Sequence, residues 1–336
     1  MRIICAIGIS IILLTGCTNE IDDNLIQDDT KDIVENNFQD DSKIEEKIDK
    51  ETTNRIEDDT VQEDAKEVVE DIDTVEATYN MPSLDIPILN PEGTTIEERY
   101  NPPAGYTRIE VAEDSFGQFL RSQKLKPYGE KVLYYDGREK TKKNVYDSVF
   151  DVDIGDRDLH QCADAIMLLR AEYLYDQGRY DEIHFNFVSG FKAEYSKWME
   201  GYRIKVEGNK VSYYKAAEPS NTYESFRKYM NIVFAYSGTL SLEKELKSVD
   251  INDMEIGDVF IVGGSPGHAI IVVDMAENDE GDKIFMVAQS YMPAQETQLL
   301  INPMDQDISP WYSLKGMTRL RTPEWAFDLD QLKGFE

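Results

Sequence analysis

The stretch from Gly257 to Asp274 is the part of this chain that most constrains its fold. Val259–Val262 and Ala269–Val273 are apolar at every position and rich in β-branched residues, which is typical of short strands covered on both faces. Three glycines and a proline lie between them, and these residue types favour tight turns. We therefore expect two buried strands joined by a short loop, with His268 where the loop enters the second strand.

The surrounding segments predict the fold class. Asn278–Asp282 is typical of a turn, so Ile284–Ser290 is expected to return antiparallel to Ala269–Val273. Upstream, the pattern predicts a hairpin over Tyr202–Tyr214 and a long helix over Thr222–Tyr236. Helices that precede a mainly antiparallel sheet indicate an α+β fold.

The clearest helix is expected to begin at Asp158. Its apolar positions recur at helical spacing, at Leu159, Cys162, Ile166, Leu169 and Tyr173. Asp158 with Gln161 three residues later resembles a capping box, and Gly178 provides the stop. Cys162 then lies about one turn into the helix, where the helix N-terminus favours the thiolate form.

The N-terminal residues have the features of a processing signal. Arg2 precedes the short apolar run Ile3–Leu13, which is too short to span a membrane comfortably. Leu14-Thr15-Gly16-Cys17 follows and resembles a bacterial lipobox. That resemblance implies cleavage after residue 16, lipidation of Cys17 and an extracytoplasmic protein anchored to the bacterial membrane through that lipid.

An acidic segment separates this signal from the rest of the chain. Residues 20–76 carry 23 acidic and 6 basic residues and few aromatic ones. Such a composition buries too little apolar surface to offset the entropy lost on ordering. We expect residues 17–78 to be a lipidated, disordered tether and residues 79–336 to be one α+β globular domain.

The charge of the chain excludes some functions. Its formal net charge is −31 at pH 7, which argues against nucleic-acid binding and against direct adsorption to anionic lipid. The sequence has no P-loop, no G-x-G-x-x-G fingerprint and no paired-cysteine pattern. We expect no cofactor, no metal site and a monomer.

Cys162 and His268 are the main catalytic candidates. Cys5 is lost with the signal and Cys17 is lipidated under the lipobox interpretation, so Cys162 is the only remaining free thiol. A nucleophilic cysteine needs a base, and His268 can supply one. Papain-like hydrolases have catalytic residues in this order along the chain: a cysteine at the start of a helix, a histidine on a strand and a polar residue on the next strand.

The expected strand pairing predicts which residue orients the His268 ring as the third catalytic candidate. Asp274 lies six residues beyond His268, or about 20 Å along a strand, too far to orient its ring. A turn centred near Glu280 puts Gln289 on the same face as His268 as a diagonal neighbour. A shift of one residue in the register substitutes Ser290, and we favour Gln289.

Other side chains leave alternatives open. Tyr291, Trp311 and Tyr312 are candidates for a substrate-binding cleft, although core packing or a surface aromatic patch is the more common explanation of such aromatic residues. A lone cysteine in an apolar stripe is often a buried small hydrophobe. His160 is expected to point into solvent, and His184 is a rival base.

Two resemblances add to this interpretation. Gly257–Phe260 followed by Gly267–Val272 resembles the strand pair of NlpC-type, papain-like cell-wall cysteine endopeptidases, which implies a papain-like core, an amide substrate and His268 as base. That family usually has Asp-Cys-Ser-Gly where this chain has Gln161–Asp164. Three runs, Leu159–Ala165, Pro266–Ala269 and Ala288–Gln295, resemble an uncharacterised family of bacterial lipoproteins, a domain of unknown function.

The sequence supports two functional hypotheses. The first is an envelope cysteine hydrolase or acyltransferase that acts on a peptide, glycopeptide or amide, with Cys162 as nucleophile, His268 as base and Gln289 as orienting residue. The second is a non-catalytic envelope module of the same fold that binds a ligand or partner. Reactivity of Cys162 at neutral pH discriminates between them.

Overall fold

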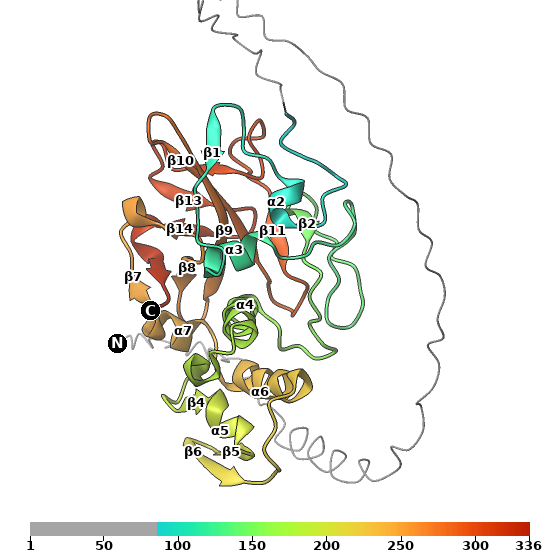
Figure 1. Cartoon of the computed structure of the whole chain (residues 1–336), viewed down its shortest axis with the longest axis vertical. Helices are drawn as coiled ribbons and strands as arrows, with labels where there is room; N and C mark the ends of the chain where they lie inside the picture. The colour runs from blue at the N-terminus through green and yellow to red at the C-terminus, as the bar shows by residue number, and fades with distance from the viewer. Residues whose placement is uncertain (1–85) are drawn as a thin grey trace, which may run out of the picture. The chain divides into compact units, whose positions relative to one another are not determined.

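The computed structural model describes residues 86–336 (Figure 1). The predicted signal peptide at 1–16, Cys17 and the acidic tether up to residue 78 lie outside the described residues, as do the first residues of the predicted domain. Among the described residues, no helix combines the length and the apolar character needed to cross a bilayer.

A nine-stranded antiparallel sheet is the centre of the described region (Figure 1). Its main path runs through β2 (Tyr146–Val149), β11 (Gln298–Leu300), β10 (Lys283–Gln289), β9 (His268–Asn278), β8 (Val259–Val262), β15 (Leu332–Gly334) and β7 (Lys247–Ser248). Two further strands join its middle, β1 (Tyr106–Arg108) on β9 and β12 (Tyr312–Ser313) on β10. The expected α+β class with a mainly antiparallel sheet is confirmed.

Strands β8 and β9 form the expected hairpin. Val262 lies opposite His268 across the pair, and the loop between them holds the Gly/Pro cluster. Within β9, Ile271 and Val273 point to one face and Ile270 and Val272 to the other, and all four are buried. Because both faces of the sheet are covered, β9 has no polar face, as its sequence predicts.

The helices of the described region lie mainly on one side of this sheet. They are α2 (Ile96–Arg99), α3 (Phe116–Arg121), α4 (Cys162–Asp176), α5 (Tyr195–Met199), α6 (Tyr223–Tyr236) and α7 (Thr239–Glu245), with 3-10 turns η1 (Tyr180–Glu182), η2 (Ile251–Asp253) and η3 (Leu329–Gln331). Helix α4 packs against β9 and β10. Figure 1 shows α4 between the sheet and a group formed by α5, α6 and small hairpins.

Three two-stranded hairpins complete the described region. They are β3 (His184–Asn186) with β4 (Lys192–Glu194), β5 (Tyr202–Glu207) with β6 (Lys210–Lys215), and β13 (Arg319–Arg321) with β14 (Ala326–Asp328). The last of these covers the face of the sheet opposite α4, where Phe327 packs near Phe260 with ring centroids 5.9 Å apart. The sheet therefore separates two apolar clusters, a larger one beneath α4 and a smaller one beneath the β13–β14 hairpin.

Helix α4 begins later than expected. Its first residue is Cys162 and its N-cap is Gln161, whose backbone N–H donates to Asp164 Oδ2 at 3.0 Å. Asp158 does not cap the helix, because its Oδ1 accepts from the backbone N–H of Ala294 at 2.7 Å and from the Gln161 side chain. The prediction of Asp158 as N-cap was therefore wrong, and Cys162 occupies the first helical position.

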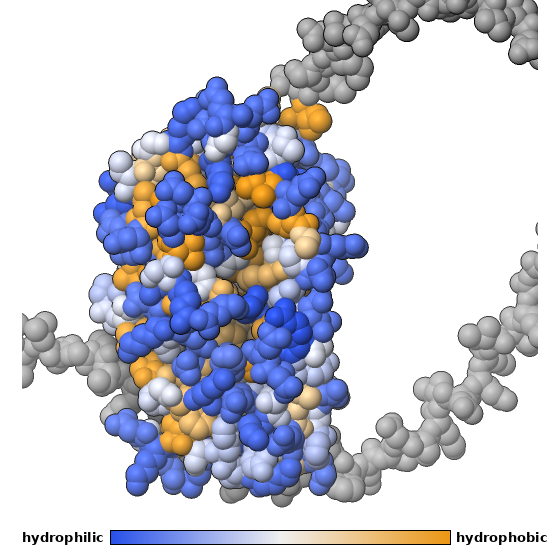
Figure 2. All heavy atoms as spheres, turned by 60° about the vertical axis from the view of Figure 1, so that its left-hand side comes forward, coloured by the Kyte–Doolittle hydropathy of each residue, from blue (hydrophilic) through white to orange (hydrophobic). Residues whose placement is uncertain are grey.

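The outer surface carries scattered apolar side chains. The most exposed large ones are Ile86, Tyr128, Val188, Tyr214, Tyr223, Leu240, Met292 and Met304. They come from different elements, and on the face shown in Figure 2 polar residues divide the apolar ones into separate patches.

A buried ion-pair cluster ties the N-terminal elements to the sheet. Asp274 of β9 is fully buried and accepts from Arg121 Nε of α3 at 2.5 Å and from Arg108 Nε of β1 at 2.7 Å. Arg121 also donates to the carbonyl of Met275 at 3.1 Å. Both carboxylate oxygens are therefore paired, which a charge at this depth requires.

We predict that Asp274→Ala lowers the free energy of unfolding by about 3–5 kcal/mol, because it leaves two guanidinium groups without their carboxylate. Urea unfolding measures this loss. Glu182→Ala is the matched control, since it breaks the exposed Glu182–Arg179 pair and should leave stability unchanged within error. Equal effects of the two substitutions would contradict the assignment of Asp274 as a structural anchor.

Candidate functional site

The Cys162 thiol lies at the start of α4 beside β9. The backbone N–H groups of Ala269, Ala163 and Cys162 itself act to lower the pKa of this thiol. Ala269 follows His268 in β9, so the thiol lies against the backbone one residue from the imidazole-bearing position. Cys162 is only 6 % exposed.

Burial dominates the chemistry of this thiol. It raises the pKa of Cys162 to about 11, and the charge of Asp164 adds to the rise, while the three N–H groups act in the opposite direction. The expected stabilisation of the thiolate by the helix N-terminus is therefore present but outweighed. At neutral pH the resting side chain is a thiol.

His268 and Gln289 meet through a direct hydrogen bond. His268 Nε2 and Gln289 Oε1 are 2.8 Å apart, and both residues are buried. The pairing of β9 with β10 explains the contact, because Ala288 lies opposite Ile271 and the two strands run antiparallel. These two side chains then project from the same face near one end of the sheet.

Ser290 takes no part in this contact. Its hydroxyl lies 2.8 Å from the carbonyl of His160 and 2.6 Å from that of Gln295. A one-residue step along a strand reverses the side-chain direction, so Gln289 faces His268 and Ser290 faces the other way.

Aromatic rings surround the imidazole. The ring centroid of His268 is 4.8 Å from that of Tyr291, 5.4 Å from Trp325 and 6.0 Å from Phe327. Burial, then the charges of Glu324 and Cys162, raise the pKa of Tyr291, so its hydroxyl lies within electrostatic reach of both groups. Tyr291 therefore packs on the His268 ring, and its pKa responds to charge at both Glu324 and Cys162.

A polar chain extends from Gln289 away from the histidine. Gln289 Nε2 donates to Glu324 Oε2 at 2.7 Å, and Lys140 Nζ donates to the same oxygen at 2.7 Å. Lys140 also reaches Gln298 Oε1 at 3.2 Å. The sequence patterns did not identify Glu324, Lys140 and Trp325. They lie in a loop and in the β13–β14 hairpin, and no periodic pattern in the sequence indicates that these segments pack beside β10.

The imidazole is neutral in this environment. Burial lowers the pKa of His268 to about 4, against smaller opposing effects of the Gln289 hydrogen bond and the Glu324 charge. The resting pair at neutral pH is therefore a thiol and an unprotonated imidazole, not a thiolate–imidazolium pair.

Two predicted cleft residues lie in the apolar cores. Trp311 is fully buried in the cluster beneath α4, and its Nε1 donates to the carbonyl of Asn101 at 3.1 Å. Tyr312 is buried in β12 on the opposite face, and its hydroxyl donates to the carbonyl of Ile301 at 2.5 Å. Core packing accounts for both aromatic residues, and of the three candidates only Tyr291 borders His268.

The other histidines lie apart from His268. His160 is buried, with Nε2 3.0 Å from Thr297 Oγ1, so the expectation that it points into solvent was wrong. It precedes α4 in a segment packed near Phe234 of α6, which local helical spacing does not reveal. His184, the rival base, lies in β3 with Nε2 3.8 Å from Glu245. Within residues 86–336, no three His, Cys, Asp or Glu side chains converge as a metal-binding group.

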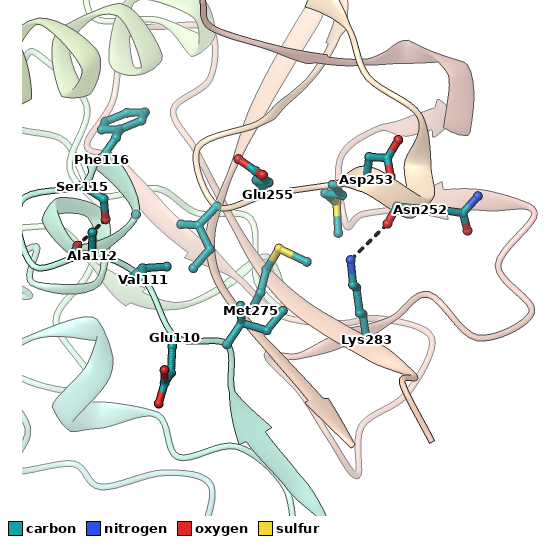
Figure 3. Close-up of a pocket in the computed structure, with 14 residues that line it drawn as sticks. Glu110, Val111, Ala112, Ser115, Phe116, Asn252, Asp253, Glu255, Met275 and Lys283 are labelled. Atoms are coloured by element: carbon teal, nitrogen blue, oxygen red, sulfur yellow. Dashed lines mark hydrogen bonds between the residues drawn. The ribbon is translucent and has the colours of Figure 1, made fainter. Parts of the chain in front are cut away.

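A groove of about 720 Å³ lies elsewhere on the domain (Figure 3). Its lining includes Val111, Phe116, Glu255, Met275 and Lys283 but none of the side chains around His268. Figure 3 shows that these residues come from the loop before α3, from the segment around η2 and from β9 and β10. Met275 is seven residues beyond His268, or roughly 23 Å along the strand, so the two regions are distinct.

One known protein family matches most of the described region. A family model described as Domain of unknown function (4846) matches residues 96–334. The chain belongs to this family. The matched DUF4846 region contains the complete set formed by Cys162, His268, Gln289 and Glu324. Searches of curated proteins and of solved structures gave no match.

The buried histidines of this DUF4846 protein predict a loss of stability in acid. Folding lowers the pKa of His268 to about 4 and that of His160 to about 3, from 6.5, mainly through burial. Below pH 6.5 the unfolded chain therefore binds more protons, and the free energy of unfolding falls as the pH drops towards 4.

We expect His160→Gln to reduce this pH slope by up to about 1.4 kcal/mol per pH unit, the contribution of one titrating group. Urea unfolding between pH 4.5 and 7 measures the slope. In parallel, the ring C–H signals of His160 and His268 in NMR spectra should not titrate above pH 5. Titration of either ring near pH 6.5 would contradict the burial argument.

Proposed function

We propose that this protein is a membrane-anchored cysteine hydrolase or acyltransferase of papain-like design that acts on a peptide or amide of the cell envelope. Cys162 is the nucleophile, His268 the general base and Gln289 the residue that orients the imidazole. The observation that carries the proposal is the 2.8 Å hydrogen bond between His268 Nε2 and Gln289 Oε1 at the start of β9, the strand against which α4 packs. The lipobox-like residues before Cys17 support the anchor.

The reaction begins with attack of the Cys162 sulfur on the substrate carbonyl carbon. Gln289 occupies Nε2 of His268, so Nδ1 is the nitrogen that accepts the thiol proton during attack. The tetrahedral oxyanion forms near the N–H groups of the first turn of α4, which have no partner within the helix. Imidazolium then protonates the leaving amine, the C–N bond breaks, and a thioester remains on Cys162.

The second half of the reaction restores the thiol. Water, or an amine in a transferase, attacks the thioester carbonyl and loses a proton to His268. The C–S bond breaks, and that proton returns to the sulfur, giving the carboxylic acid or the new amide. Because thiol and imidazole are both neutral at rest, the proton moves in the chemical step and not beforehand.

A substrate reaches the proposed site past side chains that are partly exposed. Cys162 and His268 are both buried, whereas Tyr291 and Trp325, which contact the imidazole ring, are partly exposed. Met292, beside Tyr291, is 58 % exposed. A substrate therefore approaches across these aromatic residues, whose rings suit the apolar parts of a peptide or glycopeptide.

A second function rests on a specific observation. Cys162 is 6 % exposed and its pKa is raised to about 11, as for a buried cysteine that only fills space. Under this alternative the domain binds an envelope ligand or a partner protein without chemistry, and Cys162 contributes to packing.

Acylation by p-nitrophenyl acetate separates the two functions. With the full chain at pH 7.5, we expect release of about one equivalent of p-nitrophenol and an acetyl group on the peptide that contains Cys162, mapped by mass spectrometry. Cys162→Ala should abolish both, and His268→Ala should slow acylation by about 10²–10⁴-fold, the usual contribution of a positioned base.

His184→Ala is the matched histidine control and should leave the acylation rate unchanged, because His184 lies in β3 and contacts Glu182 and Glu245. A folded wild-type chain whose Cys162 is acetylated only in denaturant would overturn the catalytic proposal and favour the binding module.

A further inference from the structure

The Gln289 side chain makes two hydrogen bonds of opposite kind. Its Oε1 lies 2.8 Å from His268 Nε2, and its Nε2 lies 2.7 Å from Glu324 Oε2. We propose that Glu324 is a positioning residue that fixes the orientation of the Gln289 amide and thereby sets the tautomer of His268. This inference rests on the proposed function and adds a fourth residue to its machinery.

The direction of each hydrogen bond follows from Lys140. Its ammonium group has only protons to donate, and its Nζ lies 2.7 Å from Glu324 Oε2. That oxygen is therefore an acceptor, and the Gln289 atom that faces it must be the NH₂ group. The Gln289 carbonyl oxygen is left to face His268 and can only accept.

The consequence for His268 is a single tautomer. Because Gln289 Oε1 accepts, His268 Nε2 must carry the proton, and the neutral ring keeps its lone pair on Nδ1. Nδ1 is then the nitrogen able to receive the Cys162 proton. If the Gln289 amide reverses, its NH₂ group meets Nε2, the ring proton moves to Nδ1, and the base is blocked.

The surroundings of Glu324 hold it in this role. It lies in the turn of the β13–β14 hairpin, and its side chain is 6 % exposed. Lys140 comes from a loop far away in the sequence, and the exposed Lys142 reaches the other carboxylate oxygen at 3.3 Å. Trp325, the next residue, packs on the His268 ring. One hairpin turn therefore supplies both the acceptor for Gln289 and a cover for the imidazole.

The test is the tautomer of His268 in the full chain, read from the ¹⁵N shifts of its ring nitrogens. The chain has three histidines, so His160→Gln and His184→Gln variants assign the signals. We expect the Nε2–H form in the wild type. Glu324→Ala should give a mixed or Nδ1–H form and slow acylation of Cys162 at least about tenfold. Glu324→Gln retains an acceptor oxygen and should restore the Nε2–H form and most of the rate.

Glu324→Ala also leaves Lys140 buried without its partner, which threatens folding. The double variant Lys140→Met/Glu324→Ala removes both charges, and near-ultraviolet circular dichroism checks that it is folded. It should show the same loss of the Nε2–H form as Glu324→Ala.

A folded double variant that keeps His268 fully in the Nε2–H form overturns the inference. The tautomer is read without any substrate, so its outcome is independent of the proposed function. If the wild type does not acylate but Glu324→Ala shifts the tautomer, the proposed chemistry fails while the positioning role of Glu324 stands.

Discussion

Burial of β9 on both of its faces is the constraint on which the rest of the structure depends. Its alternate residues enter two different apolar clusters, one beneath α4 and one beneath the β13–β14 hairpin. A strand in this position cannot shift its register by one residue without moving every side chain to the wrong core. The strand is therefore fixed in space, and its two buried polar residues, His268 at its start and Asp274 near its middle, are held by partners from distant segments.

The two polar groups of β9 have different consequences. Asp274 binds two arginines from α3 and β1, so it joins the N-terminal elements to the sheet. His268 begins the strand, where Gln289 of β10 reaches Nε2 and the thiol of α4 lies against Ala269. A rigid strand can hold an imidazole in one geometry, which a catalytic base needs. The fold thus fixes how α4, β9 and β10 lie around the candidate site.

Much of this arrangement could be predicted from local sequence patterns. The apolar runs around the Gly/Pro cluster predict β8, β9 and their loop, and the turn after Asn278 predicts the return of β10 that brings Gln289 towards His268. The start of α4 could not be predicted, because Ala294 binds Asp158 from another part of the chain. Aromatic character alone does not separate a cleft from a core, hence the error over Trp311 and Tyr312. Glu324 and Lys140 are brought together only by tertiary packing, so no residue spacing in the sequence predicts their contact.

The central claim is that His268 removes the proton of a neutral Cys162 thiol, and the pH profile of acylation tests it most directly. Acylation of Cys162 by p-nitrophenyl acetate should be nearly independent of pH from about 5.5 to 8 in the wild type, because the pKa of His268 is lowered to about 4. In His268→Ala the rate should rise about tenfold per pH unit over the same range, since only thiolate reacts and the pKa of Cys162 is raised to about 11. A wild-type rate that rises as steeply as that of the variant would contradict the account.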